Sequence, residues 1–258
     1  MAILLTNDDG IDAPGLAALA QALAGLDDLL VAAPAENQSG VGMGISIRRG
    51  LRARRHPDGP NGLPRHSLDG TPVDVVKYAL GHLLRDKPPR LLVSGINHGP
   101  NLGRNVRCSG TVGAAFEALA SGIPALAVSV GYTLPPIWEA AQAYAGKLAR
   151  KLLELSVRRP GRPILLNLNV PSLPPEELLG LVVRRHGSGG FQDDLVAGAA
   201  DGAFTLGGEW RETPGGDCDA AAFEAGYAVI TPLRLEMTDE SLLKELNRDW
   251  RDDLAAGG

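Results

Sequence analysis

The chain opens on the stretch AILLTNDDG, residues 2–10, and this stretch decides the fold class. A short aliphatic run that ends in asparagine, two aspartates and glycine is typical of a buried strand followed by a polar loop. A helical pattern begins near Pro14, and proline suits the first position of a helix. The stretch therefore predicts a β-strand, a loop with acidic residues and then a helix, which together form the repeating unit of α/β proteins.

The same alternation of apolar runs and helical patterns continues as far as residue 170. Thr71, followed by Pro72 and Asp74, predicts a capped start for one of the helices. Strands are expected at residues 2–5, 29–33, 91–94, 125–130 and 164–170, and helices from Pro14 and at residues 72–84, 111–121 and 138–155. The alternation predicts an α/β fold with a doubly wound, mostly parallel sheet and helices on both faces.

Two regions depart from this alternation. Residues 44–47 predict an additional strand, and the Arg- and His-rich residues 48–69 predict a hairpin or an excursion off the main sheet. From about residue 181 the pattern changes to short β-like runs among glycines and acidic residues, followed by a strand at 226–235 and a capped helix at 238–250. We expect a single domain over residues 1–258, with a core at 1–180 that carries the site and a less regular, β-rich C-terminal extension at 181–258.

Length and composition agree with one globular domain. The 258 residues are 44% hydrophobic and 21% charged, which is enough apolar sequence for a single core. The net charge of −5 argues against a general nucleic-acid binder or a partner of anionic membranes, since both need a basic face. The two cysteines suit a reducing cytoplasm. We expect a cytoplasmic protein without a signal peptide or a membrane span, because acids follow the first apolar run and glycines and prolines interrupt residues 118–138.

Oxygen-bearing side chains follow three of the predicted strands, in residues 7–10 (NDDG), 37–40 (NQSG) and 95–99 (GINHG). Ligands of doubly wound sheets bind outside the carboxyl ends of the strands, so these segments are expected to meet in one crevice. Carboxylate, hydroxyl and amide oxygens are the donors that Mg²⁺, Mn²⁺ or Ca²⁺ prefers. Each segment alone is also compatible with an ordinary turn, since Asn, Asp and Gly tolerate left-handed backbone conformations.

The segment SGTVGAA, residues 109–115, predicts the start of a helix with small residues. The free N–H groups at a helix N-terminus attract anions, so this segment is a candidate phosphate site, although an ordinary Ser/Thr cap explains the same pattern. Two carboxylates about 5 Å from a phosphate dianion would oppose its binding by about 13 kcal/mol at an effective dielectric constant of about 20. A divalent cation reverses this repulsion, lowers the pKa of bound water and polarises a phosphoryl oxygen, which together suffice for hydrolysis of a phosphomonoester.

Other motifs do not fit. Gly146 and Lys147 lie within a predicted helix and form no P-loop, and residues 40–44 (GVGMG) lack the spacing of a dinucleotide-binding fingerprint. No Gly-x-Ser-x-Gly occurs. His98 adjoins the third oxygen-bearing segment and could protonate a leaving group, but we interpret it as a solvent-facing loop residue. Five arginines within residues 48–55 are interpreted as a solvated hairpin face or a subunit contact rather than a nucleic-acid surface.

Together, these segments resemble the SurE family of stationary-phase survival proteins, which are metal-dependent nucleotidases. The resemblance rests on TNDDGI (6–11), AP (33–34), QSG (38–40), GTPVD (70–74), SGINHGPNLG (94–103), SGTVGAA (109–115), GY (226–227) and ITPL (230–233). These blocks occur in the family's order and span nearly the whole chain. Cys108 departs from the family pattern, which usually has tyrosine or histidine before the serine of SGTVGAA.

The resemblance implies a Rossmann-like core that binds one divalent cation per subunit, Mg²⁺ or Mn²⁺. The positions that match the family's metal ligands are Asp8, Asp9, Ser39 and Asn97, and the two aspartates would also be the catalytic residues. The positions that match the family's phosphate site are Asn101, Ser109, Gly110 and Thr111. The resemblance further implies a cytoplasmic homodimer or homotetramer whose C-terminal elements are exchanged between subunits.

The implied activity is hydrolysis of nucleoside 5′-monophosphates to nucleoside and phosphate by attack of a metal-bound water. Members of the family often accept 3′-monophosphates, and some accept short polyphosphate. The alternative is a regulatory module that binds nucleotide and metal in the same crevice without turnover, because a cation site and a phosphate cradle serve binding equally well.

Overall fold

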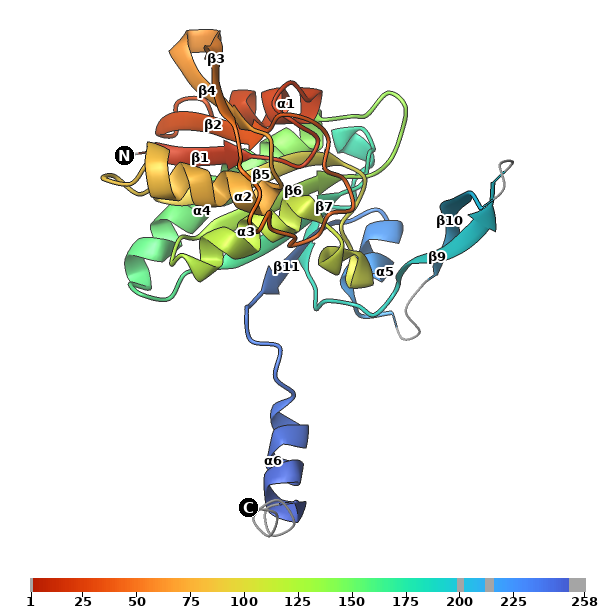
Figure 1. Ribbon diagram of the computed structural model, residues 1–258. Helices are drawn as coiled ribbons and strands as arrows, with labels where there is room; N and C mark the ends of the chain where they lie inside the picture. Colours follow the sequence, from red (N-terminus) through yellow and green to blue (C-terminus); the bar gives the residue numbers. More distant parts are fainter. Residues whose placement is uncertain (1, 199–201, 212–215, 251–258) are drawn as a thin grey trace.

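The central sheet is mostly parallel and carries helices on both faces (Figure 1). The computed structural model describes residues 2–198, 202–211 and 216–250. Within these residues the sheet has nine strands, in the order β3 (Ala53–Gly59), β4 (Leu63–Leu68), β2 (Asp28–Pro34), β1 (Ala2–Thr6), β5 (Leu91–His98), β6 (Ala125–Val130), β7 (Leu165–Val170), β11 (Ala228–Leu233) and β8 (Leu181–Val183). The pairs β3–β4 and β7–β11 are antiparallel and the other neighbours are parallel, which confirms the predicted fold class.

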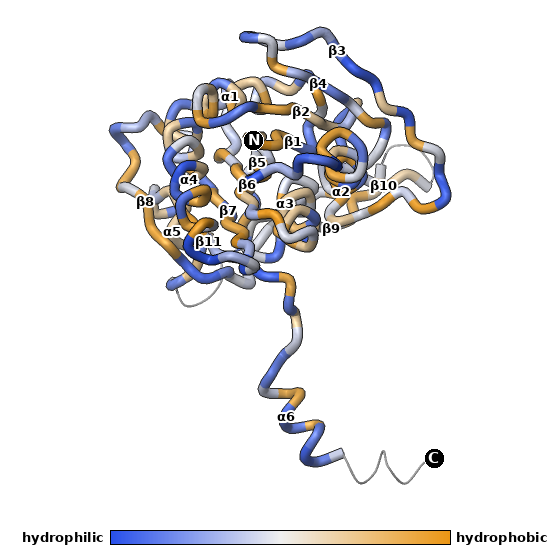
Figure 2. Tube along the Cα trace, turned by 90° about the vertical axis from the view of Figure 1, so that its left-hand side faces the viewer, coloured by the Kyte–Doolittle hydropathy of each residue, from blue (hydrophilic) through white to orange (hydrophobic). Residues whose placement is uncertain are grey.

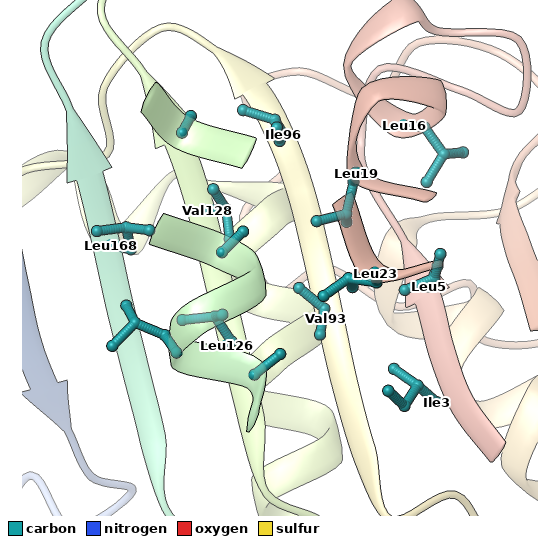
Figure 3. Close-up of a cluster of buried hydrophobic side chains, with 14 of the residues drawn as sticks. Ile3, Leu5, Leu16, Leu19, Leu23, Val93, Ile96, Leu126, Val128 and Leu168 are labelled. Atoms are coloured by element: carbon teal, nitrogen blue, oxygen red, sulfur yellow. The ribbon is translucent and has the colours of Figure 1, made fainter. Parts of the chain in front are cut away.

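Helices α1 (Pro14–Leu23) and α4 (Glu139–Arg158) cover one face of the sheet, and α2 (Pro72–Tyr78) and α3 (Gly110–Ala120) cover the other. Successive side chains of a strand point to opposite faces. Ile3 and Leu5 of β1 therefore join the core beneath α1 and α4, whereas Leu4 packs with residues of α2 and α3. Figure 3 shows Leu19 and Leu23 of α1 directed at β5, and Leu16 belongs to the same core. Each face of the sheet thus has its own apolar core.

The predicted start of α2 is confirmed. Thr71 Oγ1 accepts a hydrogen bond from the Asp74 amide at 3.2 Å, and Asp74 Oδ2 accepts one from the Thr71 amide at 2.9 Å. This reciprocal pair is a capping box, with Pro72 at the first helical position. The α-helix ends at Tyr78, and a π-helical turn follows directly over Ala79–Leu83.

The strand predicted at residues 44–47 is wrong, because this segment is an irregular loop. Its polar backbone groups bond to the start of α2 rather than to a neighbouring strand. Thr71 Oγ1 donates a hydrogen bond to the Gly44 carbonyl at 2.7 Å, and the Ser46 amide donates one to Asp74 Oδ1 at 3.0 Å. Burial alone would raise the pKa of Asp74, but the hydrogen bonds from Ser46 and Thr71 outweigh it and lower the pKa.

Strand β5 is longer than predicted. The sequence placed its end at Ser94, but the strand continues to His98 through a register shift against β6 between Ser94 and Asn97. The third oxygen-bearing segment is therefore the end of a strand rather than a loop. A short helix, α5 (Asp219–Glu224), was not predicted at all. The hairpin expected within residues 48–69 is confirmed as the antiparallel pair β3–β4, but it is no excursion off the main sheet, because β4 pairs with β2 and the hairpin forms one edge of that sheet.

Two C-terminal elements project from the body of the molecule. Strands β9 (Gly190–Ala197) and β10 (Phe204–Arg211) form an antiparallel hairpin separate from the central sheet, and α6 (Glu240–Asp249) extends away from the body (Figures 1 and 2). No residue of α6 is buried. Strands β8 and β11, by contrast, complete the central sheet. Within the described part of the chain, no helix combines the length and apolar character that crossing a membrane requires.

Candidate active site

The loop after β1 places two aspartates at the carboxyl edge of the sheet. Asn7, which is fully buried, closes the turn: its Nδ2 donates to the Gly10 carbonyl at 2.9 Å and its Oδ1 accepts from the Gly10 amide at 3.3 Å. Gly10 has a φ of +106°, a conformation that side chains rarely adopt. Asn7 thus has a structural role, and the turn that it closes presents Asp8 and Asp9 side by side.

Asp8 lies against the N-terminus of α3. It is only 3% exposed, and the Thr111 hydroxyl donates a short hydrogen bond to Asp8 Oδ1. Gly110 makes this approach possible, because a Cβ at that position would lie 2.7 Å from Asp8 Cβ. Burial raises the pKa of Asp8, and the hydrogen bond from Thr111 offsets part of the rise.

Asp9 is partly exposed, and its pKa is raised from 3.8 to about 6. Burial is the larger cause and the charge of Asp8 is the second, while the backbone N–H of His98 lowers the pKa. Within the described residues, no group of three or more His, Cys, Asp or Glu side chains could hold a metal. A cation here would therefore bind the two carboxylates together with neutral oxygens, which is the donor set of a hard divalent ion. Such an ion would also relieve the repulsion between Asp8 and Asp9, so these residues fit it.

The loop after β2 folds back onto the two aspartates. The Gln38 amide donates to the Asp8 carbonyl at 2.7 Å, and Asn37 Nδ2 lies 3.4 Å from Asp9 Oδ1. Asn37 Oδ1 in turn accepts a hydrogen bond from the Ser39 amide at 2.8 Å. These contacts tie the loop that carries the exposed Ser39 to the two aspartates.

The end of β5 contributes Asn97. Its Nδ2 donates to the Gly99 carbonyl at 2.7 Å, so its side-chain oxygen is the atom that could serve as a ligand of a cation. Strand β5 is the direct neighbour of β1 in the sheet. The structure therefore brings the four predicted metal-ligand positions to one edge of the sheet. Asp8 and Asp9, in the loop after β1, lie between the segments that carry Ser39 and Asn97.

The predicted phosphate residues lie beside this group and already have protein partners. Ser109 is the N-cap of α3, since its hydroxyl accepts a hydrogen bond from the Val112 amide at 3.1 Å, and Thr111 donates to Asp8. The ordinary-cap interpretation of Ser109 is thus confirmed. The backbone N–H groups of Gly110 and Thr111 bond to the Asp8 carboxylate, so what the segment offers an anion is the positive end of the α3 dipole beside the loop that holds Asp8.

Asn101 is held in a buried polar network. Its backbone amide donates to Asn169 Oδ1 at 2.7 Å, its Nδ2 donates to the Ser129 hydroxyl at 2.8 Å, and its carbonyl accepts from Asn167 and Asn169. An amide nitrogen carries two hydrogens, so one remains for a ligand. Three residues of this network were not predicted from the sequence, namely Ser129, Asn167 and Asn169, although polar residues at fully buried positions of apolar strands are a usable signal.

Comparison with known proteins identifies the family. The sequence model described as "Survival protein SurE" matches residues 3–193. The chain belongs to the SurE family. The resemblance found in the sequence is thereby confirmed, and it covers the aspartate loop, the end of β5 and the start of α3.

The SurE relatives match over nearly their whole length. A protein of Anaeromyxobacter sp. (strain Fw109-5) named "5′-nucleotidase SurE" is 40% identical, over 97% of this chain and 96% of the relative. A protein of Shigella dysenteriae serotype 1 named "5′/3′-nucleotidase SurE" is 39% identical, over 100% and 99%. The crystal structure of the SurE protein from Aquifex aeolicus has a TM-score of 0.77 at 31% identity, and the match covers 96% of this chain and 99% of that one.

One residue of this SurE chain lies differently from the expectation, and the departure from the family pattern at Cys108 has a place in the fold. His98 is half-buried at the end of β5 rather than solvent-facing in a loop, and its Nε2 lies 2.8 Å from the Thr133 carbonyl. Because a carbonyl only accepts, Nε2 carries the proton and donates it to this bond. Cys108 is exposed, and its carbonyl accepts a hydrogen bond from the Gly42 amide at 3.0 Å.

Proposed function

We propose that this chain is a metal-dependent phosphomonoesterase that hydrolyses nucleoside 5′-monophosphates. The observation that carries the proposal is the pair of aspartates, Asp8 and Asp9, held side by side in front of the N-terminus of α3. The names of the SurE relatives as 5′-nucleotidases support the substrate class. The 5′/3′-nucleotidase name of one relative supports 3′-monophosphates as additional substrates, and short polyphosphate is a further candidate.

The residues proposed to hold one divalent cation, Mg²⁺ or Mn²⁺, are Asp8, Asp9, Ser39 and Asn97. When bound, the cation supplies Lewis-acid chemistry by acidifying water and polarising a phosphoryl oxygen. Thr111 fixes the orientation of the Asp8 carboxylate through its hydrogen bond. Asp8 is also proposed to orient the attacking water or to accept its proton.

The transferred phosphate is proposed to lie against the first turn of α3. There the helix dipole would favour its negative charge. The backbone N–H groups of Gly110 and Thr111 bond to the Asp8 carboxylate in this structure, and they would donate to the phosphate oxygens if Asp8 turned toward the cation. The remaining Nδ2 hydrogen of Asn101 would add a donor on the β5 side of the site. Ser109 would keep this end of α3 in place as its N-cap.

Phosphate release from AMP tests the proposal. We expect turnover with Mn²⁺ or Mg²⁺, loss of turnover after chelation, and loss of turnover in Asp8→Asn with the fold retained by circular dichroism. Metal-dependent binding of AMP by calorimetry, with no phosphate released over hours, would contradict hydrolysis and support the non-catalytic binding module instead.

We also propose that the chain is one domain whose C-terminal extension serves subunit contacts in a homodimer or homotetramer. The hairpin β9–β10 exposes apolar residues that nothing in the described part of the chain covers, among them Leu195 (70%), Phe204 (65%) and Leu206 (70%). The projecting α6 separately exposes Leu242 and Leu243, and its C-cap residue Trp250 is exposed as well. Light scattering on the full chain is expected to give a dimer or tetramer mass, and Leu206→Lys should lower that mass. A monomer at all concentrations would contradict the proposal.

A further inference from the structure

An exposed aromatic residue stands at the same edge of the sheet as the two aspartates. Tyr132 lies two residues beyond the end of β6, and 68% of it is exposed to solvent. Aromatic residues make up only 4% of the chain, so a tyrosine left open beside the candidate active site needs an explanation. Neither the proposed metal site nor the proposed phosphate site uses it.

The ring of Tyr132 is held in place by His98. The two rings are stacked, with centroids 4.6 Å apart and planes inclined by 11°. His98 is fixed in turn by the hydrogen bond from its Nε2 to the Thr133 carbonyl, at 2.8 Å, and by the edge of Trp138, whose ring centroid is 6.1 Å away. One face of Tyr132 is covered by His98, and its high exposure leaves the other face open.

The loop that carries Tyr132 is tied to the body of the protein. The Thr133 hydroxyl lies 2.5 Å from the Ser172 hydroxyl, which also accepts a hydrogen bond from the Ile137 amide at 3.1 Å. The tyrosine is therefore presented on an anchored loop, and a ligand that stacks on it would not have to order the loop first.

The aromatic pair lies within reach of a nucleotide bound at the aspartates. The backbone N–H of His98 faces the Asp9 carboxylate and lowers its pKa, so the pair begins next to the proposed metal site. Strand β5 lies between β1 and β6. Neighbouring strands are about 4.8 Å apart, so Tyr132 stands roughly 10 Å from the aspartate loop along the edge. A ribose spans the gap between a phosphate and a base on this scale.

We propose that Tyr132, backed by His98, is the platform on which the nucleobase of the substrate stacks. The inference rests on the proposed function and adds the residue that distinguishes nucleotides from other phosphomonoesters. Every base has a π-face, so stacking on one tyrosine would accept purines and pyrimidines alike, with larger bases bound more tightly. The platform therefore predicts that substrates with a base are preferred over phosphomonoesters without one, and it predicts no selection of a particular base.

The test compares AMP with ribose 5-phosphate, which lacks the base. In Tyr132→Ala, the ratio of kcat/KM for AMP to that for ribose 5-phosphate should fall about tenfold, mainly through KM for AMP. Tyr132→Phe keeps the ring and should keep the ratio. Leu134→Ala is the matched control, because Leu134 lies on the same loop with 78% exposure but has no aromatic face.

An unchanged ratio in Tyr132→Ala overturns the platform, including the case in which the variant only lowers the melting temperature because the aromatic pair merely stabilises the loop. A wild-type protein that hydrolyses neither compound contradicts the proposed function instead. In that case calorimetry on the Mn²⁺-loaded protein decides the platform separately. Affinity for AMP that falls about tenfold in Tyr132→Ala supports stacking, and equal affinity in both proteins refutes it.

Discussion

Replacing Asp9 by asparagine should stabilise the metal-free protein near neutral pH and abolish its stabilisation by Mn²⁺. Burial and the charge of Asp8 raise the pKa of Asp9 from 3.8 to about 6. Without a cation, the ionised Asp9 therefore opposes folding above that pH. Asparagine has nearly the same shape and no charge, so it removes the repulsion while it removes a proposed metal ligand.

The shift in pKa sets the size of this effect. A rise of about two units is equivalent to about 3 kcal/mol, which solvent screening reduces to on the order of 1 kcal/mol because Asp9 is partly exposed. The folded state binds the Asp9 proton more tightly than the unfolded state does. The stability that Asp9 contributes is thus fully present below its ordinary pKa of 3.8 and is lost as the pH rises through about 6. The advantage of Asp9→Asn should accordingly be largest above pH 6 and vanish toward pH 4.

Thermal unfolding in the presence of a chelator measures this advantage. For a chain of this length, about 1 kcal/mol corresponds to a rise of roughly 2–4 °C in Tm. Wild-type Tm should increase further with Mn²⁺, and that of Asp9→Asn should not. Asp86→Asn, at an exposed loop position, controls for the loss of a negative charge. A metal-free variant no more stable than wild type at pH 7.5, or one equally stabilised at pH 4, would refute the electrostatic argument.

Three further substitutions test other parts of the site and fold. Gly110→Ala should reduce phosphate release at least tenfold and destabilise the protein by about 1–3 kcal/mol, because the new Cβ would lie 2.7 Å from Asp8 Cβ; an unperturbed rate would show that the close approach is not needed. Asn169→Ala removes two hydrogen bonds to Asn101 and should lower stability by about 1–3 kcal/mol and raise KM for AMP. A fall in Tm without any change in KM would show that the network does not contribute to substrate binding. Asp74→Ala breaks the capping box of α2 and should lower stability by about 1 kcal/mol, and denaturant unfolding with an unaltered midpoint would contradict that role.

The parts of the fold that the sequence could predict are those decided by local chemistry. The apolar runs of β1 and β6 and the cap formed by Thr71 and Asp74 each specify an element through neighbouring residues. The strand predicted at residues 44–47 was wrong because the conformation of this segment depends on residues distant in the sequence. Its apolar and polar pattern fits a strand, but its backbone partners are residues of α2 far along the chain. Long-range partners of this kind leave no periodic signal.

In the candidate site, too, some residues could be predicted from local sequence and others depend on tertiary contacts. The loop of Asp8 and Asp9 and the cap at Ser109 follow from position after a strand or before a helix, so the sequence located them. The residues that hold the site in place could not be predicted, because Asn169 bonds to Asn101 across 68 residues of sequence. The stacking of His98 on Tyr132 is likewise a contact between the ends of two neighbouring strands. Residue type predicts which groups do the chemistry, and tertiary contact decides what holds them.

Helix α6 provides an internal reporter of assembly. It has only ten residues and buries none of them, and helices shorter than about 12–15 residues are marginal in water on their own. Its amide hydrogens should therefore exchange rapidly in an isolated subunit and slowly where a neighbouring surface covers Leu242 and Leu243. Protection of these amides as a function of protein concentration would chart subunit association from within the chain, without a label.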